Sequence, residues 1–82
     1  MSYRDVILNE ISAVFREEGI APPNEFTDDM ILMELGLDSL GYAVLVTKLL
    51  DILGFDPFVE SDTPFYPSTF GDFVAFYDAR NL

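Results

Sequence analysis

The chain has 82 residues, with 15 acidic and four basic side chains and neither cysteine nor histidine. A net charge of -11 argues strongly against nucleic acid or an anionic membrane as a partner. Without cysteine or histidine there are no disulfides, no thiolate ligands and no imidazole base. A domain of this length also has no room for a deep enzyme cleft. We therefore expect one domain over residues 1–82 that is not an enzyme.

The first predicted element is an amphipathic helix from about Tyr3 to Glu18, which Gly19 ends as a C-terminal cap. A loop of about twenty residues follows and reaches Asp38. This loop is too apolar to be free, so we expect it to fold back onto the helices. The apolar residues concerned are Met30, Ile31, Met33, Leu35 and Leu37.

A second helix is predicted to begin at Asp38 or Ser39 and to end near Leu53, where Gly54 follows and Pro57 prevents continuation. Its longest apolar stretch is too short to span a bilayer, and the N-terminus lacks the apolar core of a secretion signal. We expect a cytoplasmic monomer with no membrane insertion.

The last predicted helix begins near Thr69, which forms an approximate capping box with Asp72. One short helical turn is expected over Ser61 to Phe65, before this last helix. No strand pattern is present. The predicted fold class is all-α, a small four-helix bundle with three main helices and one short third helix.

The start of the second helix carries the most informative residues, Asp38, Ser39 and Leu40. The first backbone N–H groups of a helix have no partner within it, and together with the helix dipole they favour an anion. A phosphate ester on Ser39 would therefore be tolerated there. Asp and Ser are also common N-cap residues, so this pattern alone favours a simple helix cap.

The run Glu34-Leu35-Gly36-Leu37-Asp38-Ser39-Leu40 resembles the prosthetic-group motif of acyl carrier proteins. The resemblance extends over the whole chain, including the last predicted helix. It implies an acyl-carrier-protein-like bundle with 4'-phosphopantetheine attached to Ser39 by a phosphopantetheinyl transferase that uses coenzyme A and magnesium. It further implies an acyl or aminoacyl thioester on the arm, and partner enzymes that load, transfer or condense it. Asp38 and Leu40 would be recognised by these partners.

The predicted second helix departs from the pattern of carriers in fatty acid synthesis. Val44, Leu50 and Ile52 occupy positions where acidic residues are common in those relatives. The helix is apolar nearly all round, which predicts an exposed apolar strip that includes Val44 and binds dedicated partners. The alternative is that the preceding loop and the aromatic segment cover this strip. A specialised lipid, polysaccharide or secondary-metabolite pathway fits better than general fatty acid synthesis.

Two other features have competing interpretations. The many aromatic residues after Gly54 are expected to form core, with an acyl pocket between the second and last helices as the alternative. The pair Asp28-Asp29 lacks the spacing of a calcium loop and is expected to be a solvated turn without metal. The competing function for the whole chain is a helical interaction module in which Ser39 is only a cap.

Overall fold

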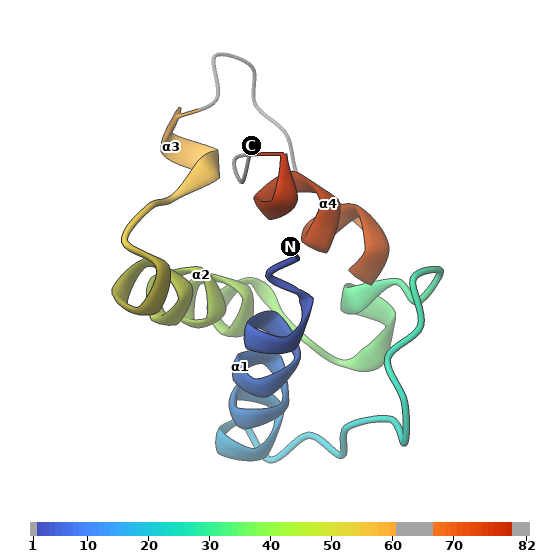
Figure 1. The fold of residues 1–82 in the computed structure, drawn as a ribbon. Coiled ribbons are helices and arrows are strands. Elements are labelled where there is room, and N and C mark those ends of the chain that lie inside the picture. The colour runs from blue at the N-terminus through green and yellow to red at the C-terminus, as the bar shows by residue number, and fades with distance from the viewer. Residues whose placement is uncertain (1, 61–66, 80–82) are drawn as a thin grey trace.

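Four helices and one turn of 3-10 helix are present in the computed structural model, which describes residues 2–60 and 67–79 (Figure 1). In chain order these elements are α1 (Arg4–Glu17), η1 (Leu32–Leu35), α2 (Ser39–Leu53), α3 (Pro57–Glu60) and α4 (Phe70–Asp78). Across the described ranges there is no strand, only an isolated bridge between Ile31 and Thr69. The predicted class of three main helices and one short third helix in an all-α bundle is confirmed.

Helix α1 turns one apolar stripe to the core and ends where the sequence predicts. The N–H groups of Gly19 and Ile20 donate to the carbonyls of Arg16 and Phe15 over 3.2 and 2.8 Å. This pair of bonds is the Schellman motif, and Gly19 adopts the left-handed φ of 73° that it requires. The buried stripe has helical spacing and consists of Ile7, Ile11, Val14 and Phe15.

The loop between α1 and α2 folds back onto the core, as predicted, but partly through other residues. Phe26, Leu32 and Leu37 are buried, whereas Ile31 and Met33 remain 38% and 54% exposed. The inward assignment of Ile31 and Met33 is therefore wrong. In a 3-10 turn residues three apart share a side, so the burial of Leu32 leaves Met33 on the outside of η1.

The same loop pairs with the beginning of α4, far along the chain. The N–H of Phe70 donates to the carbonyl of Met30 over 2.8 Å, and that of Gly71 to the carbonyl of Asp28 over 2.9 Å. The contact is close enough that a Cβ on Gly71 would lie 3.0 Å from this Asp28 oxygen. Thr69 caps α4 by accepting from the N–H of Asp72 over 3.0 Å, which is half of the predicted capping box.

The connection after α2 contains a short helix earlier than predicted. Gly54 ends α2 with a φ of 83°, and α3 begins at Pro57, a residue suited to the first helical position. The Asp56 carboxylate accepts from the N–H of Phe58 over 2.9 Å and so supports this start. The helical turn predicted over Ser61 to Phe65 lies outside the described residues.

Aromatic side chains fill the space between α2, α3 and α4. The Phe73 ring lies at their centre, with its centroid 5.6 Å from that of Tyr42, 6.1 Å from Phe58 and 5.1 Å from Tyr77. Phe70, Phe73 and Tyr77 are fully buried, so their predicted assignment to the core is confirmed. In the described part of the chain no helix is long and apolar enough to cross a membrane.

Candidate functional site

Asp38 is the residue that caps α2. Its backbone is extended, with φ of -92° and ψ of -177°, and its carboxylate accepts from the N–H of Gly41 over 2.8 Å. This is the usual N-cap geometry, in which a side-chain oxygen satisfies one of the free N–H groups of the first turn. The interpretation of Ser39 as the cap is therefore wrong, because the preceding residue performs that role.

Ser39 is the first residue of α2 and its side chain is exposed. Within residues 2–60 and 67–79 its hydroxyl makes no hydrogen bond, unlike the neighbouring Asp38 carboxylate. Ser39 begins a helix of 15 residues. The helix dipole and the unpaired backbone N–H groups of the first turn therefore favour negative charge beside the Ser39 hydroxyl. The hydroxyl is thus free to be modified, and its surroundings fit a phosphate ester.

The face of α2 around Leu40 is apolar only near its beginning. Leu40 is 68% exposed, but Val44, one turn later, is half-buried and packs against the core. The next residues on this face are Thr47 and Asp51, both exposed and polar. A continuous exposed strip through Val44, as predicted, is therefore not formed. The alternative, that the preceding loop and the aromatic segment cover this strip, stays a prediction.

A groove of about 390 Å³ lies beside this face, between the end of α1 and the middle of α2. Lys48 and Glu17 form an ion pair across it, with Nζ and Oε2 3.3 Å apart. Lys48, the only basic side chain of α2, is therefore engaged in an ion pair. Ala43 and Val44 also line the groove, so it includes apolar surface, and the interpretation of α2 as a helix-binding module stays a prediction.

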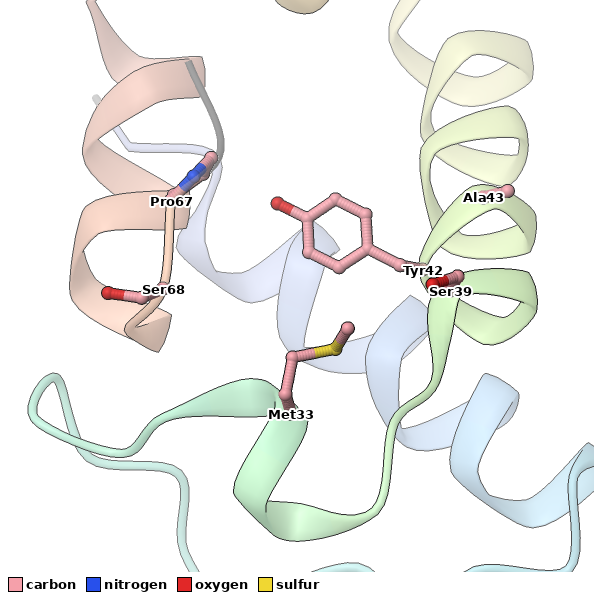
Figure 2. Close-up of a pocket in the computed structure, with 6 residues that line it drawn as sticks. All are labelled: Met33, Ser39, Tyr42, Ala43, Pro67 and Ser68. Carbon is pink, nitrogen blue, oxygen red and sulfur yellow. The ribbon is translucent and has the colours of Figure 1, made fainter.

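On the other side of Ser39 is an apolar cavity of about 410 Å³ (Figure 2). Figure 2 shows α2 forming one wall and the segment leading into α4 forming the opposite wall, with Met33 of η1 between them. None of the described residues that line it is charged. They are Met33, Ser39, Tyr42, Ala43, Pro67 and Ser68.

Backbone pairing joins η1 to the wall that is formed by the segment leading into α4. The N–H of Leu32 donates to the carbonyl of Ser68 over 3.0 Å, next to the bridge between Ile31 and Thr69. Met33 and Ser68, which both line the cavity, are adjacent to these bonds. The pairing therefore fixes the position of η1 relative to this wall.

Tyr42 extends from α2 across the cavity toward the opposite wall (Figure 2). Its ring contacts Phe58 and Phe73 edge-on, with centroids 6.3 and 5.6 Å apart. Its hydroxyl is buried and has no hydrogen-bond partner among the described residues. Burial raises the pKa of Tyr42 well above its ordinary value, so the hydroxyl stays protonated at neutral pH.

The expectation that Ser39 is an attachment residue stays a prediction. The alternative of an acyl pocket between the second and last helices comes close to this cavity, but the wall opposite α2 is the segment before α4, and the described lining includes none of the aromatic residues after Gly54. One available signal was that Tyr42 lies three residues after Ser39, a spacing that places both side chains on one helix face. The contributions of Met33, Pro67 and Ser68 depend on the pairing of distant segments, which leaves no local pattern.

The acidic pair in the loop is engaged with other side chains. Arg4 Nη1 lies 2.6 Å from the Asp28 carboxylate, and Asp29 accepts from the Thr27 hydroxyl over 2.6 Å. In the part of the chain that the structure describes, there is no group of three or more His, Cys, Asp or Glu side chains that could hold a metal ion.

No protein-family model, curated protein or solved structure matches the chain.

Proposed function

We propose that this chain is a carrier protein that holds acyl or aminoacyl groups on a 4'-phosphopantetheine arm attached to Ser39. The observation that carries the proposal is the exposed Ser39 hydroxyl at the head of α2. It makes no hydrogen bond with any described residue, because Asp38 provides the cap. The resemblance of residues 34–40 to the motif of acyl carrier proteins supplies the identity of the arm. The all-α fold agrees with such a carrier.

Ser39 would take up the arm in a reaction catalysed by a phosphopantetheinyl transferase with coenzyme A and magnesium. The Ser39 oxygen would bond to the phosphorus that bears the arm, and adenosine 3',5'-bisphosphate would leave. The free N–H groups at the start of α2 would stabilise the phosphodiester charge. When attached, the arm supplies the thiol that this chain, which has no cysteine, cannot provide.

We propose that partner enzymes recognise Asp38 and Leu40. Leu40 is 68% exposed beside Ser39, and Met33 is 54% exposed across the cavity mouth, so an apolar contact is available around the attachment point. The partners would be loading ligases and acyltransferases or synthases. The chain's net charge of -11 favours partners with basic surfaces. We propose that the chain is a cytoplasmic carrier that serves a specialised pathway.

A mass measurement tests the attachment. The folded protein is incubated with coenzyme A, magnesium and a promiscuous phosphopantetheinyl transferase, and its intact mass is recorded. We expect one added phosphopantetheine that is absent in Ser39→Ala. Ser68→Ala is the matched control, because Ser68 is exposed and lines the same cavity. Absence of any addition with several transferases, or an addition retained in Ser39→Ala, would contradict the proposal.

A further inference from the structure

The end of α4 is attached to the residues that precede α1. The Asp78 carboxylate accepts two hydrogen bonds, one from the Ser2 hydroxyl over 2.6 Å and one from the N–H of Tyr3 over 2.8 Å. One bond uses Oδ2 and the other Oδ1, so both carboxylate oxygens are engaged. Figure 1 shows the start of α1 next to α4.

The position of Asp78 is unfavourable for α4 alone. Asp78 is the last residue of this helix, where the dipole disfavours a negative charge, and the last turn has no basic residue. The start of α1 has the opposite requirement, because Tyr3 provides no side-chain cap and the dipole there favours a carboxylate. The Ser2 hydroxyl, which Asp78 holds, also accepts from the N–H of Arg4 over 3.1 Å. The charge of Asp78 is therefore explained by α1 and not by its own helix.

Arg4 contacts the other end of α4. Its Cζ lies 5.0 Å from the centroid of the Phe70 ring, which belongs to the first residue of α4. Its Nη1 is paired with the Asp28 carboxylate, and the backbone carbonyl of Asp28 accepts from the N–H of Gly71. Both side chains of this ion pair are partly exposed, so the pair alone contributes little. Residues 2–4 thus contact α4 at both of its ends.

Helix α4 has few other attachments through its backbone. Among the described residues, its backbone bonds to other elements involve only Phe70 and Gly71 at its start. The segment immediately before α4 carries Pro67 and Ser68, which line the cavity beside Ser39. Movement of α4 away from the bundle would therefore open this cavity on one side. It would also expose the buried face of α4, which consists of Phe70, Phe73, Val74 and Tyr77.

We propose that residues 2–4 form a clasp on α4, and that α4 undocks from the bundle as one unit when this clasp opens. The clasp consists of the two bonds to Asp78 at one end and the contacts of Arg4 with Asp28 and Phe70 at the other. Because the cavity wall leads directly into α4, the clasp also sets how often that wall moves away. This device belongs to the fold and does not depend on attachment of a prosthetic group.

Amide hydrogen exchange of the folded protein tests whether α4 is a separate unit. An element that undocks alone exchanges its amides without unfolding of the remaining structure. In the parent protein, we expect the amides within α4 to exchange at least roughly tenfold faster than the slowest amides of α1 and α2. Equal exchange in the three helices would overturn the proposal, because α4 would then open only together with the whole fold.

Asp78→Ala tests the clasp, because the effect within α4 and the effect on docking have opposite signs. Alanine favours the helix and removes a charge that the dipole disfavours, so an isolated α4 would become more stable. Loss of two bonds to a carboxylate should instead accelerate exchange within α4 by roughly tenfold or more. Asp51→Ala is the matched control, since Asp51 is an exposed acid in the last turn of α2, and it should leave exchange within α4 unchanged. Unchanged or slower exchange within α4 of Asp78→Ala would contradict the clasp.

Asp38→Ala separates undocking of α4 from unfolding of the whole chain. The Asp38 cap on α2 is retained when α4 undocks and is lost only when α2 unfolds. This variant should therefore accelerate the slowest amides of α2 by roughly fivefold and leave those of α4 unchanged. Equal acceleration in α2 and α4 would show that the two helices open together, which contradicts the proposal.

Thiol labelling provides a second readout of undocking. Since the chain has no cysteine, Val74→Cys places a single thiol on the buried face of α4. Its alkylation rate with iodoacetamide, a neutral reagent, should rise roughly tenfold or more when Asp78→Ala is added and stay unchanged when Asp51→Ala is added. Adding Arg4→Met should raise the rate by about two- to threefold, because the ion pair is exposed. A rate that responds neither to Asp78→Ala nor to Arg4→Met would overturn the proposal.

Discussion

Asp38 caps α2 through the N–H of Gly41 over 2.8 Å, and this bond leaves the adjacent Ser39 hydroxyl with no structural task. The arrangement is tight, because a Cβ on Gly41 would lie 2.7 Å from the Leu37 side chain. Capping and attachment are thus assigned to two neighbouring residues. The two roles can be separated by mutation.

Replacement of Asp38 by alanine should lower the free energy of unfolding by about 1 kcal/mol, the usual effect of losing an N-cap. Asp51→Ala is the matched control, since Asp51 is an exposed acid on the same helix away from the cap. It should change the stability by no more than about 0.5 kcal/mol. Urea unfolding measures both values, and equal effects would contradict the capping role.

Asp38→Ser separates the cap from the charge. Serine provides a capping oxygen, so stability should stay within about 0.5 kcal/mol of the parent protein. If partners recognise the Asp38 carboxylate, the rate of phosphopantetheine attachment should nevertheless fall. Full attachment by this stable variant would show that the charge is not recognised by the transferase.

Leu40→Glu and Val44→Glu should have different effects, because the two residues are unequally exposed. Leu40 is 68% exposed, so a charge there should leave stability within about 0.5 kcal/mol and impair loading by a cognate enzyme. Val44 packs against the core, so its replacement should cost roughly 1–3 kcal/mol. Urea unfolding and loading rates test both, and normal loading of Leu40→Glu would remove Leu40 from the partner site.

Burial raises the pKa of both Tyr42 and Tyr77, and the Asp56 carboxylate adds to the effect at Tyr77. In the unfolded chain tyrosine ionises near pH 10, at roughly its model value. The stability that these groups contribute is therefore fully present below about pH 10 and lost as the pH rises further. Unfolding at increasing pH should show this decline, and Tyr42→Phe/Tyr77→Phe should make it shallower. An unchanged slope would contradict the assignment.

Gly71→Ala tests the close contact between α4 and the loop, because the contact and helix propensity predict opposite changes in stability. Helix propensity alone predicts that alanine stabilises α4 by up to about 1 kcal/mol. A Cβ at this position would instead meet the backbone oxygen of Asp28 at 3.0 Å and its Cβ at 2.7 Å. We expect the collision to dominate and the variant to be less stable than the parent protein, as measured by urea unfolding. A stabilised variant would show that the loop moves away without cost.

Much of the fold could be predicted because its helix boundaries are local. Gly19 and Gly54 end α1 and α2 where the sequence indicates, and Thr69 caps α4. Helix α3 was not predicted, because Pro57 was expected only to prevent continuation of the preceding helix. In the structure Pro57 begins α3, and Asp56 supports this start. The helical turn predicted over Ser61 to Phe65 lies outside the described residues and stays a prediction.

Only the part of the candidate site at the start of α2 could be predicted from the sequence. Asp38 and Ser39 are adjacent to each other and to the helix start, so the motif defines them. The cavity depends on backbone bonds between η1 and the segment before α4, as from Leu32 to Ser68. The partial burial of Val44 likewise depends on neighbours from other elements. No periodicity within α2 encodes either feature.

The isolated bridge between Ile31 and Thr69 has a consequence for the order of assembly. It closes a loop of about 40 residues, an entropic cost that the local cap at Asp38 does not carry. The serine can therefore be presented by a chain that has formed α2 but has not yet joined α4 to the loop. In the proposed carrier, such a partly folded molecule would expose Ser39 before the wall that contains Ser68 is in place. Attachment of the arm and formation of the cavity would then belong to different stages of folding.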